Sequence, residues 1–140
     1  MKEVTLVGRL VNETITFTAE MSGKSWKHSF ECDNLGLTTL EGAPSSIAGY
    51  FYASDNRLTS LHDVHKIIKS IGGGLFLERN PIKSCILGVL LIEGCTGIYL
   101  DNHPVQRIVN KYLPNDDGFR GVIDCQSELL DAGFDEYAKL

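Results

Sequence analysis

The sequence lacks the features that would direct the chain to a membrane or to an oxidising compartment. No apolar run approaches the roughly 20 residues that a membrane-spanning helix needs, and residues 1–4 (MKEV) do not begin an apolar signal segment. The four cysteines form no C-x-x-C pair, so they provide no ready pair of ligands for zinc. We therefore expect a cytosolic protein whose cysteines remain thiols.

An excess of basic residues is also missing. The chain has 13 Lys and Arg residues against 18 Asp and Glu residues, a formal net charge of −5. This charge argues against nonspecific binding to nucleic acid or to anionic membranes, both of which need a basic surface. With 140 residues, of which 43% are hydrophobic, the chain is long enough and apolar enough to form one folded domain with a core.

What the sequence does contain is a repeated pattern. Residues 75–82 (LFLERNPI) read L-x-L-x-x-N-x-I, residues 51–58 (FYASDNRL) and 98–105 (IYLDNHPV) follow the same frame, and a degenerate copy begins at Phe30. The copies start 21, 24 and 23 residues apart, which is the period of leucine-rich repeats. We expect each copy to form a short strand that ends in a turn, and the copies to pair side by side in parallel.

Between the strands the sequence predicts short returns. Asp63 is expected to cap a helix that runs to Lys69, and Ser84 a short helix that ends at Gly94. The glycines at 72–74 precede a strand and lack the Lys-Ser/Thr of a phosphate loop, so they predict a turn.

The two ends are expected to close the stack, because the terminal copies of a repeat array leave their apolar edges open. Residues 3–19 alternate in a strand-like way, with Val4, Leu6, Ile15 and Phe17 on one face and a turn at residues 11–14, and they predict a β-hairpin cap. Trp26, His28 and Phe30 continue the alternation into the first copy. Residues 105–113 are amphipathic. Residues 124–140 predict one helix broken at Gly133, or two short helices, with Leu129, Leu130, Phe134, Tyr137 and Leu140 on the apolar face. The expected organisation is one domain over 1–140, with a β cap (1–29), about four repeats (30–117) and a helical cap (118–140).

Two stretches carry a family resemblance. Residues 56–61 (NRLTSL) and 37–44 (LTTLEGAP) resemble the N-x-L-T-S-L-E-G-A-P units of small leucine-rich-repeat-like proteins that are common in bacteriophage genomes, and they are similar to repeats of secreted bacterial effectors. The resemblance covers residues 30–113. It implies an α/β repeat fold, a short solenoid with parallel strands. Asn34 stands one position early and His103 replaces an asparagine, so the first and fourth repeats are expected to pair less regularly.

Residues between the inward positions are expected to face outward and to align across the strands. The first outward column is Glu31, Tyr52, Phe76 and Tyr99, the second is Asp33, Ser54, Glu78 and Asp101, and the third is Asn34, Asp55, Arg79 and Asn102. Three aromatic rings would then stand beside a row that is rich in carboxylates. Such a surface is complementary to a basic, partly apolar partner.

We therefore expect a non-catalytic protein-interaction module without a cofactor, which binds neither nucleic acid directly nor a membrane. The anchors would be Tyr52, Phe76 and Tyr99, and the charged guides would be Asp33, Asp55, Glu78, Arg79 and Asp101. The resemblance to phage proteins implies a purpose, the inhibition of a host defence or nucleic-acid-processing protein in the host cytosol.

Two other classes of function remain open. The outward aromatic residues are also suited to self-association, as a homodimer or as a structural component of a virion. The carboxylates of Asp33, Glu78 and Asp101 are hard oxygen ligands, and they leave open a metal-dependent enzyme. His62 and His65 would need further ligands to bind zinc, and no cysteine pair offers them.

Overall fold

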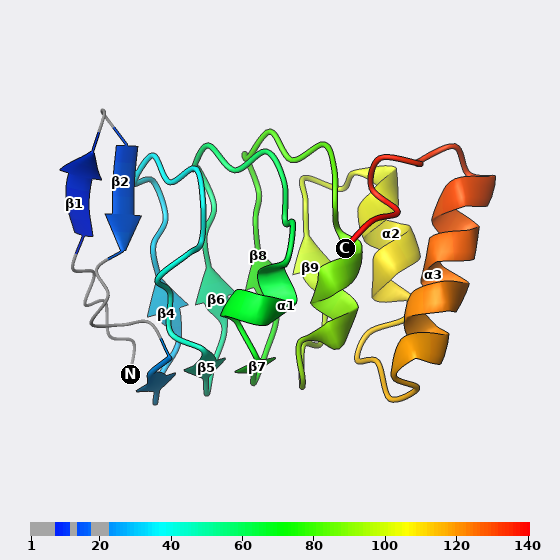
Figure 1. The fold of residues 1–140 in the computed structure, drawn as a ribbon, viewed down its shortest axis with the longest axis horizontal. Helices are drawn as coiled ribbons and strands as arrows, with labels where there is room; N and C mark the ends of the chain where they lie inside the picture. Colours follow the sequence, from blue (N-terminus) through cyan, green and yellow to red (C-terminus); the bar gives the residue numbers. More distant parts are fainter. Residues whose placement is uncertain (1–7, 12–13, 18–22) are drawn as a thin grey trace.

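A computed structural model describes residues 8–11, 14–17 and 23–140 of the chain, with side chains from residue 23 onward. The strands are β1 (Gly8–Val11), β2 (Thr14–Phe17), β3 (Ser25–Trp26), β4 (Phe30–Glu31), β5 (Ser46–Ile47), β6 (Phe51–Tyr52), β7 (Ser70–Ile71), β8 (Leu75–Phe76) and β9 (Ile98–Tyr99). The helices are α1 (Val64–Ile67), the 3-10 helix η1 (Leu87–Leu91), α2 (Pro104–Asn110) and α3 (Phe119–Asp131) (Figure 1).

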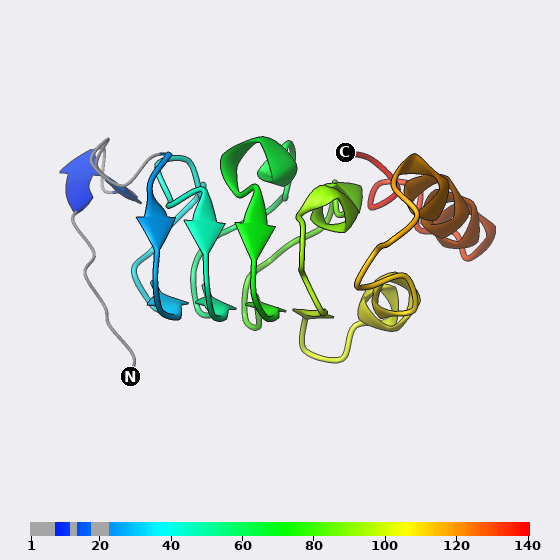
Figure 2. The same ribbon diagram turned by 90° about the horizontal axis from the view of Figure 1, so that it is seen from below.

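Two parallel sheets form the centre of the molecule. The larger sheet has the order β4-β6-β8-β9 and the smaller sheet the order β3-β5-β7. From β3 to β8 the chain alternates between them, so each passage adds one strand to each sheet. Helices α1 and η1 lie on the side opposite to the larger sheet (Figure 2). The protein is therefore an α/β protein with two parallel-strand sheets. None of the helices in the described part of the chain is long and apolar enough to cross a lipid bilayer.

The predicted register of the larger sheet is confirmed. Phe30 pairs with Phe51, Phe51 with Leu75, and Leu75 with Ile98. Backbone hydrogen bonds continue the pairing beyond the strands, from Cys32 N to Tyr52 O at 2.8 Å and from Leu77 N to Tyr99 O at 3.0 Å. The residues at which the four copies begin therefore lie next to one another, as the spacing of the pattern requires.

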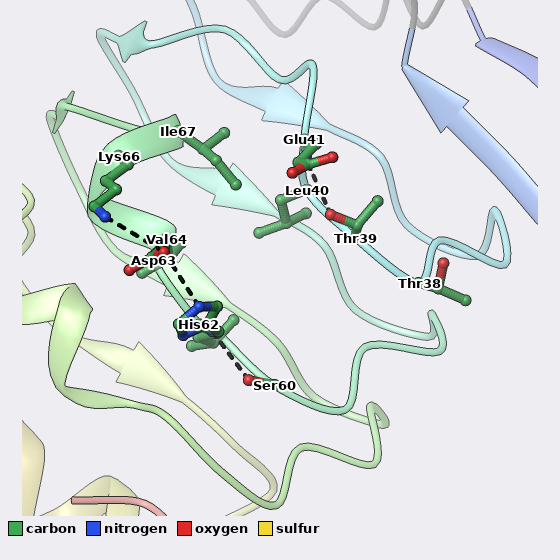
Figure 3. A pocket seen from close by; sticks show the side chains of 11 residues that line it. Thr38, Thr39, Leu40, Glu41, Ser60, His62, Asp63, Val64, Lys66 and Ile67 are labelled. Atoms are coloured by element: carbon green, nitrogen blue, oxygen red, sulfur yellow. Dashed lines mark hydrogen bonds and ion pairs between the residues drawn. The ribbon is translucent and has the colours of Figure 1, made fainter. Parts of the chain in front are cut away.

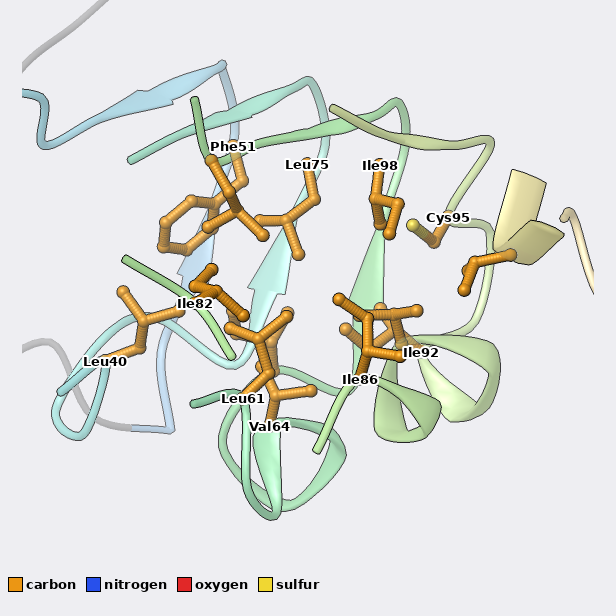
Figure 4. Packing of buried hydrophobic residues seen from close by; sticks show 14 of the residues in the cluster. Leu40, Phe51, Leu61, Val64, Leu75, Ile82, Ile86, Ile92, Cys95 and Ile98 are labelled. Carbon is orange, nitrogen blue, oxygen red and sulfur yellow. The ribbon is translucent and has the colours of Figure 1, made fainter. Parts of the chain in front are cut away.

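The alternation of the L-x-L frame also explains the core. Phe30, Phe51, Leu75 and Ile98 are fully buried, and so are the residues two positions later in the first three copies. Figure 4 shows Phe51, Leu75 and Ile98 in a row, pointing toward side chains such as Leu61 and Ile86 from the opposite side. Removing such side chains from water is the main favourable contribution to folding.

An asparagine side chain holds neighbouring passages of the chain together. Asn56 Oδ1 accepts hydrogen bonds from the backbone N–H groups of Leu35 and Leu37, at 2.9 and 3.0 Å. Its Nδ2 donates to the carbonyl oxygens of Cys32 and Ala53, at 2.9 and 3.0 Å. Asn80 repeats the arrangement one passage later. These bonds satisfy backbone groups that the turn removes from the sheet.

The less regular pairing expected for the first copy does not occur, because its backbone hydrogen bonds match those of the second copy. The fourth copy keeps the register of the sheet but ends in a different turn. His103 stands where the asparagine is expected, and its Nδ1 accepts a hydrogen bond from Val105 N at 3.1 Å. It thereby caps α2, which begins at Pro104. Side chains of α2 then close the edge of β9: Asn110 binds both the N–H and the carbonyl of Ile98, and Gln106 accepts from Leu100 N.

The amino-terminal segment differs in extent from the expected β cap. Strands β1 and β2 pair antiparallel, with Val11 opposite Thr14, which agrees with the predicted turn. Val4 and Leu6, which the alternation places in the same hairpin, lie outside the described residues. Ser25 and Trp26 do not extend it, because they pair in parallel with β5 in the smaller sheet. A bend at 27–28 interrupts the predicted alternation from Trp26 to Phe30.

Two predicted helices are shorter than their sequence suggests. Helix α1 covers only Val64–Ile67, and Asp63 has a left-handed backbone (φ 55°) and forms no side-chain cap. Ser84 caps no helix either, because it bridges to Ser60 and the 3-10 helix η1 begins at Leu87. In both cases the chain must return to the next strand of a sheet, which limits the helix to about one turn.

The carboxy-terminal helix begins before the predicted residue 124 and is oriented differently. Helix α3 begins at Phe119 and ends before Gly133, whose positive φ of 85° stops it. Leu129 is buried as expected, whereas Leu130 and Leu140, assigned to the same apolar face, are exposed. The residues after α3 turn back to η1: the N–H groups of Cys85, Ile86 and Leu87 donate to carbonyl oxygens of residues 136, 137 and 139 at 2.9–3.0 Å.

Candidate functional site

The outward side of the larger sheet, which we call the strand face, carries a column of stacked aromatic rings. Tyr52 and Phe76 have ring centroids 4.9 Å apart and planes 22° apart, and Phe76 and Tyr99 have centroids 4.5 Å apart and planes 11° apart. The predicted column is therefore present. Stacking covers the ring faces between neighbours, so Tyr52 and Phe76 are half-buried while Tyr99 is 36% exposed. The column is a rigid ridge rather than three freely exposed rings.

A fourth ring, Tyr50, which the predicted columns do not include, enlarges this ridge. It is 46% exposed, and its centroid lies 6.1 Å from that of Tyr52 and 5.9 Å from that of Phe76. The available signal was the alternation itself, because a residue two positions before Tyr52 in an extended segment has the same orientation.

Glycines provide the space that these rings occupy. A Cβ atom at Gly73 would lie 2.5 Å from Cδ1 of Tyr50, and one at Gly74 would lie 2.9 Å from Cε2 of Tyr99. None of the residues 72–74 has a positive φ, so the glycines are needed for close approach and not for a special backbone conformation. The segment 72–74, which was predicted to form a turn, therefore also packs against the rings of Tyr50 and Tyr99.

The acidic side chains beside the ridge are held by hydrogen bonds from a neighbouring passage of the chain. Asp33 Oδ1 accepts from Ser54 N at 2.7 Å, and Glu78 Oε1 accepts from Ser54 Oγ at 2.8 Å. Asp101 Oδ2 accepts from Arg79 N at 2.7 Å. Asp33 and Asp101 are exposed and Glu78 is half-buried. The carboxylates therefore have fixed positions and remain accessible to a partner.

Arg79 pairs with Asp55 and not with its other acidic neighbours. Its Nε and Nη2 atoms donate to the two carboxylate oxygens of Asp55, at 2.6 and 2.9 Å. These hydrogen bonds lower the pKa of Asp55 and raise that of Arg79. Arg79 thus mainly neutralises Asp55 rather than Glu78 or Asp101. The remaining charge of the strand face is acidic.

The third outward column lies at four turns, and the fourth differs from the others because Asp101 (φ 53°) is left-handed as well as Asn102. Asn34, Asp55, Arg79 and Asn102 have φ values of 56°, 58°, 58° and 60°. Residues other than glycine seldom adopt this left-handed conformation, and asparagine and aspartate tolerate it best. Each turn thus has a polar or charged residue at its left-handed position.

A concave region, separate from the strand face, lies beside α1 (Figure 3). There the Asp63 carboxylate lies 3.2 Å from His62 Nε2 and 3.5 Å from Lys66 Nζ. The buried Nδ1 of His65 has no hydrogen-bond partner among the described residues, and burial lowers the pKa of this imidazole. In the part of the chain that the structure describes, no three His, Cys, Asp or Glu side chains are grouped closely enough to hold a metal ion.

Comparisons of the chain with protein-family models, curated proteins and solved structures found no match. The class that the fold defines is an α/β protein with two parallel sheets, and its most distinctive surface is the ridge of stacked aromatic rings beside fixed carboxylates.

Proposed function

We propose that the chain is a short leucine-rich-repeat-like solenoid that acts as a non-catalytic protein-interaction module. The strand face binds a protein with a basic, partly apolar surface. The observation that supports this most strongly is the stacked column of Tyr52, Phe76 and Tyr99, flanked by carboxylates that the backbone holds in place. Aromatic residues in a rigid setting are the commonest anchors of protein interfaces.

The fixed geometry favours binding because little order has to be created when a partner arrives. The rings are immobilised by stacking on one another and by packing against Gly73 and Gly74. The carboxylates of Asp33, Glu78 and Asp101 are already oriented by hydrogen bonds. Association normally costs about 0.5–1.5 kcal/mol for each flexible side chain that is immobilised. The strand face avoids most of that cost on its own side.

The charge of the strand face selects the partner. With Asp55 neutralised by Arg79, the acidic groups left beside the ridge include Asp33, Glu78 and Asp101. They attract lysine and arginine side chains and raise the rate of encounter with a basic protein. The resemblance to phage repeat units extends the proposal to a host protein whose basic site serves defence or nucleic-acid processing, which the acidic strand face would block.

The test is affinity capture from a bacterial lysate at roughly 50 mM and roughly 500 mM salt, with wild-type protein and strand-face variants side by side. We expect a partner that is retained at low salt. The double reversal Glu78→Lys with Asp101→Lys should weaken its binding about tenfold at low salt and less at high salt. Phe76→Ala and Tyr99→Ala should each weaken it about tenfold at both salt concentrations.

Matched controls lie away from the strand face and from α3. Glu93→Lys reverses an exposed charge next to the smaller sheet, and Leu140→Ala removes an exposed apolar side chain at the carboxy-terminal residue. Both should leave capture unchanged. A partner that binds all the strand-face variants as well as it binds wild type would contradict the proposed interface.

A further inference from the structure

Helix α3 carries apolar side chains on two different sides. Val122, Cys125 and Leu129 point into the molecule and are buried. On the other side Phe119, Ile123 and Leu130 are 67%, 58% and 47% exposed. Three large apolar side chains exposed on one short helix are unusual for a surface that meets only water. We call these three residues the outer stripe of α3.

The spacing of the outer stripe makes it continuous. Ile123 follows Phe119 by four residues and Leu130 follows Phe119 by eleven, which corresponds to about one and about three turns of an α-helix. The three side chains therefore lie along one line that runs the length of the helix, about 20 Å. Such a line is the arrangement that pairs with another helix.

A second line of residues runs beside the outer stripe and carries opposite charges at its two ends. Arg120 follows Phe119, and Asp131 follows Leu130, so these two residues are also eleven apart. Both side chains are exposed, and neither forms an ion pair within the described residues. Helix α3 thus has a positive charge beside its first turn and a negative one beside its last.

The position of α3 leaves the outer stripe accessible. Helix α3 lies at the end of the molecule opposite to β1 and β2 (Figure 1). The residues that follow it turn back to the N–H groups of residues 85–87, so they cover η1 and leave the stripe exposed. No described segment of the chain buries these three side chains.

We propose that the outer stripe of α3 binds a second copy of this chain, with the two α3 helices antiparallel about a two-fold axis. Reversing one helix places Phe119 against Leu130 of the other copy and Ile123 near the axis. The same reversal places Arg120 against Asp131 of the other copy, twice by symmetry. A second copy of the chain is therefore a suitable partner, because the positive end of each α3 helix lies beside the negative end of the other in an antiparallel pair.

The contact is small, which determines how the dimer should behave. Two helices of 13 residues that meet along one stripe bury less than the roughly 1,200 Å² of a typical stable complex. We therefore expect monomer and dimer to exchange at micromolar to millimolar protein concentrations, and the dimer to dissociate on dilution.

The first experiment is sedimentation equilibrium of the full chain over that range of concentration. For wild type the average mass should rise from that of a monomer toward twice that value. Ile123→Lys changes an exposed side chain, so the fold should be kept while the rise is abolished. Phe76→Ala should leave the rise unchanged. A mass that stays monomeric at all concentrations, or a dimer that is lost in Phe76→Ala and kept in Ile123→Lys, would overturn the proposal.

The second experiment tests the antiparallel order. Arg120→Glu alone and Asp131→Arg alone each place like charges together in the dimer, and each should weaken self-association about tenfold. An equimolar mixture of the two variants should restore it, because the mixed dimer regains two pairs of opposite charge. A mixture that associates no better than either variant alone would exclude this arrangement.

Discussion

At the scale of single residues, the side chains of Asn56 and Asn80 stabilise the fold by bonding to backbone groups of neighbouring passages. Asn56 is 6% exposed and accepts from two backbone N–H groups while donating to three carbonyl oxygens. Asn80 is half-buried and accepts from one N–H group, that of Leu58. A buried backbone group that loses its partner costs roughly 1–3 kcal/mol. The two asparagines should therefore differ in their effect on stability.

We expect Asn56→Ala to lower the free energy of unfolding by about 3 kcal/mol and Asn80→Ala by about 1 kcal/mol. The reason is that the first substitution leaves two backbone N–H groups without an acceptor in a more deeply buried site. Urea unfolding followed by circular dichroism would measure both values. Arg57→Ala, at an exposed neighbouring position, serves as the control and should change stability by less than about 0.5 kcal/mol. A larger loss for Asn80→Ala than for Asn56→Ala would contradict this account.

At the scale of elements, the connection between β7 and β8 determines the shape of the strand face. Its three glycines have different roles. A Cβ atom at Gly72 would overlap the carbonyl oxygen of Ala48, which belongs to the rigid backbone, whereas one at Gly73 would meet only the movable ring of Tyr50. The connection is therefore part of the aromatic ridge as well as a link between two strands.

Gly72→Ala should destabilise the protein by about 3 kcal/mol, because only a shift of the sheet backbone can relieve the overlap. Gly73→Ala should cost about 1 kcal/mol and displace Tyr50, which near-ultraviolet circular dichroism of the tyrosines would detect. Thermal unfolding would give the stabilities, with the exposed Thr96→Ala as the control. If Gly73→Ala destabilised the protein more than Gly72→Ala, the proposed role of the Tyr50 ring as the yielding group would be wrong.

At the scale of the whole molecule, the strand face and the outer stripe of α3 are separate surfaces. A dimer formed through α3 would present two strand faces, and a partner with two binding sites would then be held with higher avidity than one with a single site. The apolar core that connects these surfaces also contains three cysteine side chains that are buried. Burial raises the pKa of Cys32, raises that of Cys95 to about 11 and raises that of Cys125 to about 12.

These thiols make the stability of the whole molecule fall at alkaline pH. A thiol whose pKa is higher in the folded than in the unfolded chain contributes stability below its ordinary pKa of 9.0, and this contribution is lost as the pH rises above that value. Each such thiol should reduce the free energy of unfolding by up to about 1.4 kcal/mol per pH unit. Urea unfolding between about pH 8 and about pH 10 would measure the slope. It should be smaller in Cys125→Ala, and an unchanged slope in that variant would contradict the prediction.

Much of the strand face follows from the sequence alone. The L-x-L frame and its period placed Tyr52, Phe76 and Tyr99 in one column, because alternation along a strand is a local property and equal spacing aligns successive strands. The same frame identified the buried row of Phe30, Phe51, Leu75 and Ile98. The less regular pairing expected from the early Asn34 was wrong, because the first copy forms the same backbone hydrogen bonds as the second. The roles of these residues in binding a partner remain a prediction.

Other features were decided only by the tertiary structure. Three examples are the pairing of Arg79 with Asp55, the packing of Tyr50 against Gly73 and the exposure of Leu130. Each depends on which segments of the chain lie side by side and at what distance. Asp63 is a capping residue by type, yet its left-handed backbone prevents it from capping α1. Sequence patterns report the preference of a residue for a face or a turn. The choice among neighbours that satisfy the same preference depends on contacts between residues far apart in the chain, because packing and charge pairing act through space and not along the sequence.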